Sequence, residues 1–217
     1  MLVGLNWTLV EGAHVGLAHT PDRGAAGCHS LDDAGAYAGR SLVDLAGLFE
    51  SANPFEVAVA IAAANAHHNR PDRTGLSAEN GLEVFDLQLP TVVVGRFPRL
   101  AQRLPDAIVL EQNPGPGDRP ASDAPVLLPG AAQVAITASA LGNGTLPELL
   151  TLCDPMATVV LVGPGTPLAP ALFELGIDVL SGLVVTDPEG AARAVAEAGA
   201  VRALKRHTRL ATLRREG

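Results

Sequence analysis

The residue types best suited to chemistry gather between residues 110 and 150. Glu111 closes a short apolar run, the loop GPGD follows at residues 115–118, and the loop GNGT at residues 142–145 leads into a helix. In an open α/β sheet, small molecules bind where polar groups and flexible loops meet at strand ends. We therefore expect the functional site in this stretch.

Two carboxylates are the candidates for acid–base catalysis. Glu111 ends an apolar strand, where partial loss of solvent favours a protonated carboxyl group. Its alternative role is to hold backbone N–H groups of the adjoining loop. Asp118 belongs to GPGD, which is either a ligand-contacting loop or an ordinary turn. We predict catalytic roles for both residues, and both structural alternatives stay open.

The glycine-bearing loops predict ligand contacts through backbone N–H groups. GNGT contains Asn143, Gly144 and Thr145; it would bind an anion at the start of the next helix, or Thr145 simply caps that helix. A further loop begins at Gly163 and also precedes a helix. Neither loop is a Walker loop or the dinucleotide pattern GxGxxG. Ser139 follows a strand as a candidate nucleophile, but no GxSxG occurs and spacing implies no partner histidine.

Metal ligation is the other chemistry that the residue types allow. Cys28 and His29 form a thiol–imidazole pair, which suits a soft or borderline metal. His67 and His68 are neighbours on a predicted helix and point about 100° apart, so they do not share one ion easily. No CxxC, HxxxH or HExxH spacing occurs, which leaves a closed structural zinc site unsupported. The remaining histidines are His14, His19 and His207.

Composition excludes several classes of function. A net charge of −8 and an aromatic content of 3% argue against a nucleic-acid surface, which needs clustered positive charge or stacking platforms. Apolar residues make up 47% of the chain, which suffices for a buried core. Two distant cysteines make no disulfide framework, the N-terminus lacks the pattern of a signal peptide, and no apolar run could span a bilayer. We expect a soluble cytoplasmic protein with no nucleic-acid or membrane partner.

The first part of the chain must supply one wall of the site. Asn53 is placed as the N-cap of an alanine-rich helix that extends to about residue 69, and the alanines predict close packing against it. The polar stretch 70–81 marks a domain boundary, so we predict domains at residues 1–75 and 76–217. The other predicted elements here are strands at residues 2–10 and 14–19 and a helix at residues 41–50.

The rest of the chain alternates short apolar runs with helical segments, which indicates an α/β fold: a mostly parallel sheet with helices on both faces. The basic tail at residues 202–215 predicts the solvated face of a terminal helix, with Leu204 and Ala211 packed inward; a binding patch is the alternative. Strands are predicted at residues 91–95, 107–111, 133–137, 158–163 and 177–181. Helices are predicted at residues 98–104, 145–153, 168–175 and 188–199.

Five blocks, in this order, resemble the putative heavy-metal chelation family. They are GLNWTLVEG with HVGLAHT, SANPFEVAVAIAAANAHHN, VVVGRFP, LEQNPGPGDRPASDAPVLLPGAAQVAITASALGNGTLPELL and LVGPGTPLAPALFELGIDVLSGLVVTD. The resemblance implies a small α+β, enolase-N-terminal-like domain followed by a Rossmann-like domain. Family members usually carry a helix before the GLNWT block. The resemblance therefore implies a reduced first domain in this chain, and we expect a homodimer.

The resemblance also implies a cleft between the two domains that binds a metal ion or a metal-chelating small molecule. The alternatives to ligand contact in this cleft are helix capping for Asn53 and structural packing for Asn65 and Trp7. Mapped onto this chain, the cleft collects Asn6, Thr8, Asn53, Asn65, Phe97, Glu111, Asn113, Asp118, Thr137, Asn143 and Thr145.

Three functions fit these observations. The first is a protein, enzymatic or not, that binds a small polar metabolite or a heavy-metal complex in the cleft. The second is a transferase or lyase with a nucleotide-like cofactor at the glycine-rich strand ends. The third is a non-catalytic scaffold or regulatory protein. A heavy-metal ion is the one cofactor that the resemblance suggests, and residue spacing assigns it no ligand set.

Overall fold

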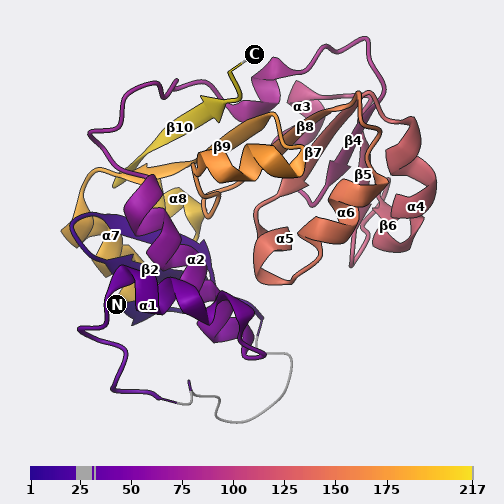
Figure 1. Cartoon of the computed structure of the whole chain (residues 1–217). Coiled ribbons are helices and arrows are strands. Elements are labelled where there is room, and N and C mark those ends of the chain that lie inside the picture. The colour runs from indigo at the N-terminus through magenta and orange to yellow at the C-terminus, as the bar shows by residue number, and fades with distance from the viewer. Residues whose placement is uncertain (23–30, 32, 217) are drawn as a thin grey trace.

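A computed structural model of the chain describes residues 1–22, 31 and 33–216 (Figure 1). A three-stranded sheet has the order β1-β2-β3, and a seven-stranded sheet has the order β10-β9-β8-β7-β4-β5-β6. Within the larger sheet all neighbouring strands are parallel except β9 and β10. The predicted α/β class, with a small additional α+β part, is confirmed.

The bounds of the elements are as follows. The strands are β1 (Leu2–Val3), β2 (Trp7–Glu11), β3 (Val15–His19), β4 (Thr91–Val94), β5 (Ile108–Glu111), β6 (Arg119–Pro120), β7 (Gln133–Thr137), β8 (Thr158–Val162), β9 (Val179–Val185) and β10 (Thr208–Arg214). The α-helices are α1 (Leu42–Ala46), α2 (Pro54–His68), α3 (Leu100–Arg103), α4 (Ala124–Leu127), α5 (Ser139–Gly142), α6 (Leu146–Leu152), α7 (Pro188–Ala196) and α8 (Val201–Leu204). Short 3₁₀ helices occupy Gly47–Glu50, Gly81–Val84, Ala121–Asp123, Leu128–Gly130 and Pro170–Leu175.

The small sheet differs from its prediction at its first strand. Residues 2–10 are not one strand, because the chain turns at Gly4 and β1 folds back antiparallel on β2, pairing Val3 with Thr8. The Gly4 N–H donates to the Trp7 carbonyl at 3.0 Å and closes this turn. Asn6 is thereby half-buried at a bend instead of lying in a continuous strand.

Helix α2 packs against the small sheet at very short range, as its alanines predicted. Asn53 caps it by accepting a hydrogen bond from the Phe55 N–H at 3.0 Å. A Cβ atom at Gly16 of β3 would lie 2.1 Å from both the Ala62 carbonyl oxygen and the Ala66 nitrogen, so only glycine fits between the strand and the helix. None of the described helices, α2 included, has the length and apolar character needed to cross a bilayer.

The parallel sheet places alternate side chains on its two faces, as strand geometry requires. Val92, Val134 and Val159 enter the core shared with α2, α4 and α6. Their neighbours, among them Val93 and Val160, pack on the opposite face under α3 and the 3₁₀ helix Gly81–Val84. A third cluster joins the small sheet to α7, through Trp7 and Leu9 with Ala191 and Val195 among others.

Two predicted helices are wrong in type. Within the predicted helix at residues 168–175, Pro170–Leu175 form a 3₁₀ helix instead of an α-helix. The basic tail forms the short helix α8 and then strand β10, which pairs along its whole length with β9. Leu204 and Ala211 are both fully buried, so their predicted inward packing is confirmed. The prediction failed because sheet pairing overrode the helix preference of Arg, Ala and Leu.

Strand β10 also holds the segment that links α2 to the parallel sheet. Ser77 and Thr212 exchange two backbone hydrogen bonds of 2.9 Å. The Thr212 hydroxyl donates to the Glu79 carbonyl at 2.7 Å, and Arg214 pairs with the Glu79 carboxylate at 2.7 Å. The linker therefore lies against the last strand of the sheet.

Candidate functional site

The parallel sheet has one point where the direction of chain travel reverses. From β4 the chain proceeds to β5 and then β6 on one side, and it returns to β7 on the other side of β4. The connections that leave β4 and β7 therefore diverge. In open α/β sheets, this divergence makes a crevice outside the carboxyl ends of the strands, and ligands bind there.

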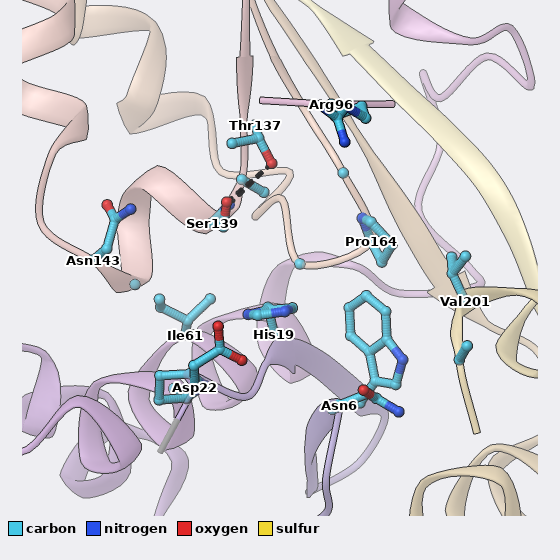
Figure 2. A pocket seen from close by; sticks show the side chains of 18 of the residues that line it. Asn6, His19, Asp22, Ile61, Arg96, Thr137, Ser139, Asn143, Pro164 and Val201 are labelled. Atoms are coloured by element: carbon cyan, nitrogen blue, oxygen red, sulfur yellow. Dashed lines mark hydrogen bonds between the residues drawn. The ribbon is translucent and has the colours of Figure 1, made fainter. Parts of the chain in front are cut away.

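A cavity of about 650 Å³ lies at this reversal point. Its walls come from both parts of the chain: Asn6 and His19 from the small sheet, and Arg96, Ser139 and Pro164 from segments that follow β4, β7 and β8 (Figure 2). We call it the first cavity. Its volume falls within the range of about 300–1,000 Å³ that is usual for small-molecule sites.

A second cavity of about 430 Å³ lies beside it, between the ends of β4 and β5 and the helices α4 and α6. Glu111, Thr145 and Glu148 supply polar groups to its wall. Polar side chains at the strand ends line both cavities, so the two spaces share one wall. The shared polar residues are Arg96, Gln112, Thr137, Ser139 and Asn143.

The shared wall depends on a close approach of the two central strands. Gly95 has φ +97°, and a Cβ atom there would lie 2.7 Å from the Thr137 methyl group. The Thr137 and Ser139 hydroxyls lie 3.1 Å apart within hydrogen-bond range (Figure 2). Glycine at position 95 thus lets the end of β4 approach Thr137 at the end of β7.

Arg96 forms an ion pair with Asp118. The guanidinium lowers the pKa of Asp118, and a hydrogen bond from the Gly115 N–H at 3.0 Å lowers it further. Asp118 is therefore held as a carboxylate that closes the GPGD turn and orients Arg96. This is the turn-holding alternative for Asp118, and its predicted catalytic role stays a prediction.

His19 and Asp22 bring ionisable groups to the first cavity from the small sheet. The His19 ring packs edge-on against Trp7, with centroids 5.8 Å apart. Although much of His19 is exposed, desolvation on its packed side lowers its pKa, and Asp22 opposes this with a smaller effect. A lowered pKa favours the neutral imidazole, which can accept a proton or a hydrogen bond.

Seven of the predicted site residues line one or both cavities. They are Asn6, Phe97, Glu111, Thr137, Asn143, Thr145 and Gly163. Their shared position supports the strand-end reasoning. The catalytic role of Glu111 and ligand binding by the other six stay predictions.

The other predicted residues lie outside both cavities. Thr8 is fully buried with its hydroxyl 3.0 Å from that of Thr20. The Asn65 amide donates to the Leu17 and Gly165 carbonyls at 2.6 and 2.9 Å and so joins α2 and β3 to the loop after β8. The remaining residues are Asn53, which caps α2, Asn113, Asp118 and Gly144.

Arg96, Gln112 and Asp22 are cavity residues that the sequence prediction did not single out. Arg96 follows Gly95 at the end of β4, and Gln112 follows Glu111 at the end of β5. The rule that selected Glu111 could have found both. The position of Asp22 depends on how the small sheet docks, which no local pattern reveals.

The described residues do not offer a ligand set for a bare metal ion. No group of three or more His, Cys, Asp or Glu side chains within residues 1–22, 31 and 33–216 is arranged to hold one. Burial raises the pKa of the Cys153 thiol to about 11, so this cysteine is not a thiolate at neutral pH. The predicted pair Cys28 and His29 lies outside the described residues.

The family of the chain follows from its sequence match. Two family models, both described as "Putative heavy-metal chelation", match residues 1–68 and 83–214, and the second alone covers more than half of the chain. The chain belongs to the putative heavy-metal chelation family. The predicted resemblance is confirmed, and no curated protein matches the chain.

Solved structures of two family members share this fold. A protein of unknown function from Desulfitobacterium hafniense is 32% identical, with a TM-score of 0.87 over 99% of this chain and 90% of that one. A protein of unknown function from Pyrococcus horikoshii is 21% identical, with a TM-score of 0.79 over 98% of this chain and 90% of that one. Heavy-metal chelation is the general function that the descriptions of the two family models suggest.

Proposed function

We propose that this protein binds a small polar organic molecule, free or as the chelator of a heavy-metal ion, in the first cavity. The observation that carries this proposal is the coincidence of the cavity with the reversal point of the sheet, where open α/β folds bind their ligands. The small sheet and α2 supply the opposite wall, so a ligand there contacts both parts of the chain.

The chemistry of the shared wall favours an oxygen-rich ligand. The Arg96 guanidinium, the Gln112 and Asn143 amides, and the Thr137 and Ser139 hydroxyls all carry hydrogen-bond donors. Carboxylate, carbonyl and hydroxyl oxygens are their natural partners, and guanidinium pairs well with carboxylates. Molecules rich in these oxygens are also chelators of metal ions.

The first cavity offers few ligands for a bare metal ion, so we expect a metal to arrive already complexed. Among the described lining residues of the first cavity, His19 and Asp22 are the side chains with common metal-ligating groups. Two protein ligands leave at least half of the coordination positions of a four- to six-coordinate ion unfilled. An organic chelator would fill these positions and would itself be held by the donors of the shared wall.

Native mass spectrometry with elemental analysis tests this proposal. The full chain is purified from cells, and a second sample is incubated with a deproteinised cell extract. We expect an organic adduct, with any heavy metal present in proportion to it. Asn143→Ala and the near-isosteric Thr137→Val should each weaken retention roughly tenfold, because each removes hydrogen bonds to the ligand.

Asn113→Ala is the matched control, because Asn113 is an exposed asparagine outside both cavities. It should retain the adduct as the parent does. The proposal fails if the metal stays bound when all organic molecules have been removed. It also fails if no adduct forms in either sample, or if both cavity variants retain the adduct fully.

A further inference from the structure

The second cavity contains a carboxylate that the proposed function does not use. Glu111 lines this cavity at the carboxyl end of β5. Within the described residues, its side chain takes part in no hydrogen bond or ion pair, since the nearby Arg96 pairs with Asp118 instead. An ionised carboxylate has only acceptor sites, so Glu111 is suited to receive hydrogen bonds from ligand hydroxyl or amine groups.

The topology gives this carboxylate a specific position. If β4 is counted as the first strand, the order β6-β5-β4-β7-β8-β9 is the 3-2-1-4-5-6 order of dinucleotide-binding folds. β5 is then the second strand, and Glu111 stands one residue beyond the pairing of Leu110 with Val94. In those folds, an acidic residue that follows the first βα unit accepts a hydrogen bond from a ribose hydroxyl.

The walls of the second cavity fit the rest of a nucleoside. Leu110, Ala140, Leu149 and Leu152 form apolar walls, with Pro125 of α4 opposite the strand ends. A flat heteroaromatic base can bury its faces against such surfaces. The volume of about 430 Å³ lies within the usual range for small-molecule sites.

The loop after β4 differs from a dinucleotide site. It reads GRFP at residues 95–98 and lacks GxGxxG, and α3 is only four residues long. A pyrophosphate therefore has no glycine-rich helix start to bind. The second cavity instead meets the first along the wall formed by Arg96, Thr137 and Ser139.

We propose that the second cavity binds the base and ribose of a ribonucleoside derivative, with Glu111 accepting hydrogen bonds from the ribose hydroxyls. The 5′ substituent then extends past Arg96 into the first cavity. This inference rests on the proposed function, because it identifies the polar ligand as a nucleoside derivative. The base and ribose bind on the β5 side of the shared wall, and the oxygen-rich substituent binds on the other side.

Titration calorimetry of the full chain with adenosine, guanosine, cytidine and uridine, and with their 2′-deoxy counterparts, tests this inference. We expect at least one ribonucleoside to bind and its 2′-deoxy form to bind about tenfold more weakly, because a hydrogen bond to a charged group is lost. This comparison needs no variant. In Glu111→Gln, the ribonucleoside should bind about tenfold more weakly and the preference for ribose should largely disappear.

Asp106→Asn is the matched control. It removes one negative charge just before the amino end of the same strand, and it should leave both affinities unchanged. The inference is overturned if no ribonucleoside binds at millimolar concentration, or if ribose and deoxyribose forms bind equally. It is also overturned if the preference for ribose survives in Glu111→Gln. If nucleosides fail while the protein retains an organic adduct that depends on Asn143, this inference falls and the proposed function stands.

Discussion

At the scale of single residues, Glu56 is a buried carboxylate held by hydroxyl groups. It lies in the first turn of α2 and is 9% exposed. Ser51 and Tyr37 both donate hydrogen bonds to it. The bond from Ser51, followed by that from Tyr37, lowers the pKa of Glu56, while burial raises the pKa of Tyr37. Glu56 thereby fixes the segment around Tyr37 to the helix that lines the first cavity.

We predict that Glu56→Gln lowers the free energy of unfolding at pH 7 by about 1–3 kcal/mol, because hydrogen bonds to a buried charge are weakened. The pKa of Glu56 is lower in the folded than in the unfolded state, so its contribution is fully present above the unfolded pKa and is lost as pH falls through the folded one. In urea denaturation, the difference in free energy of unfolding between parent and variant should therefore narrow below about pH 4.3.

Glu50→Gln is the control, because Glu50 is exposed. Its free energy of unfolding should equal that of the parent at each pH. A Glu56→Gln variant that keeps the full stability of the parent at pH 7 would show that the two hydroxyl groups do not stabilise the charge.

At the scale of elements, the packing of α2 against β3 decides how the first cavity is closed. The helix has almost no polar face, with ten buried residues among its fifteen. Gly16 permits the contact, because any side chain there would meet the helix backbone, which cannot rotate out of the way. Pro54, Ala58 and Ile61 of the same helix line the first cavity. A displaced helix would therefore change the shape of that cavity.

We predict that Gly16→Ala lowers the free energy of unfolding by about 1–3 kcal/mol or more, since overpacking forces a shift of the backbone. Chemical denaturation monitored by circular dichroism measures this loss. Gly47→Ala is the matched control, because a Cβ atom there meets nothing within 4 Å and the backbone φ is −59°. Equal stability of the two variants would contradict the close approach of β3 and α2.

At the scale of the whole molecule, two asparagines at the end of α2 join the small sheet to the large one. The Asn69 amide donates to the Thr166 and Leu183 carbonyls at 2.9 and 3.1 Å, and its oxygen accepts from the Leu168 N–H at 2.8 Å. Asn65 adds the bond to Gly165. Because the loop that contains Gly165 also lines the first cavity, these bonds hold two of its walls together.

We predict that Asn69→Ala costs about 3 kcal/mol or more, because it leaves three buried backbone groups without partners. Trp7 is the single tryptophan and lies in the small sheet, where it packs against α7, so its fluorescence reports the docking of that sheet on the rest of the chain. In urea, the parent should show coincident transitions by fluorescence and circular dichroism. In Asn69→Ala, the fluorescence transition should occur at a lower urea concentration than the circular dichroism transition. In the control Asn113→Ala, the two transitions should coincide.

The sequence predicted the individual helices and strands better than it predicted which of them lie side by side. Apolar runs such as residues 91–95 and 133–137 locate strands because buried parallel strands are apolar on both faces. That β7 lies beside β4, and that Asn143 and Arg96 therefore share a wall, depends on long-range pairing that no local pattern encodes. The same limit applies to β10, where pairing with β9 outweighed local preference, and to Asp22, whose position depends on how the small sheet docks.

The contact between β10 and the linker has a consequence for the order of folding. Ser77 and Thr212 are neighbours in space but are separated by most of the chain, and such distant pairs form late because closing a long loop costs entropy. Of the described elements, β10 is also the last to be synthesised. On the ribosome, the small sheet can fold early on α2, but the contacts of Ser77 and Glu79 with β10 cannot form until the final strand emerges. Chains interrupted before that strand therefore present an exposed edge of β9 and a linker that lacks its contacts at Ser77 and Glu79.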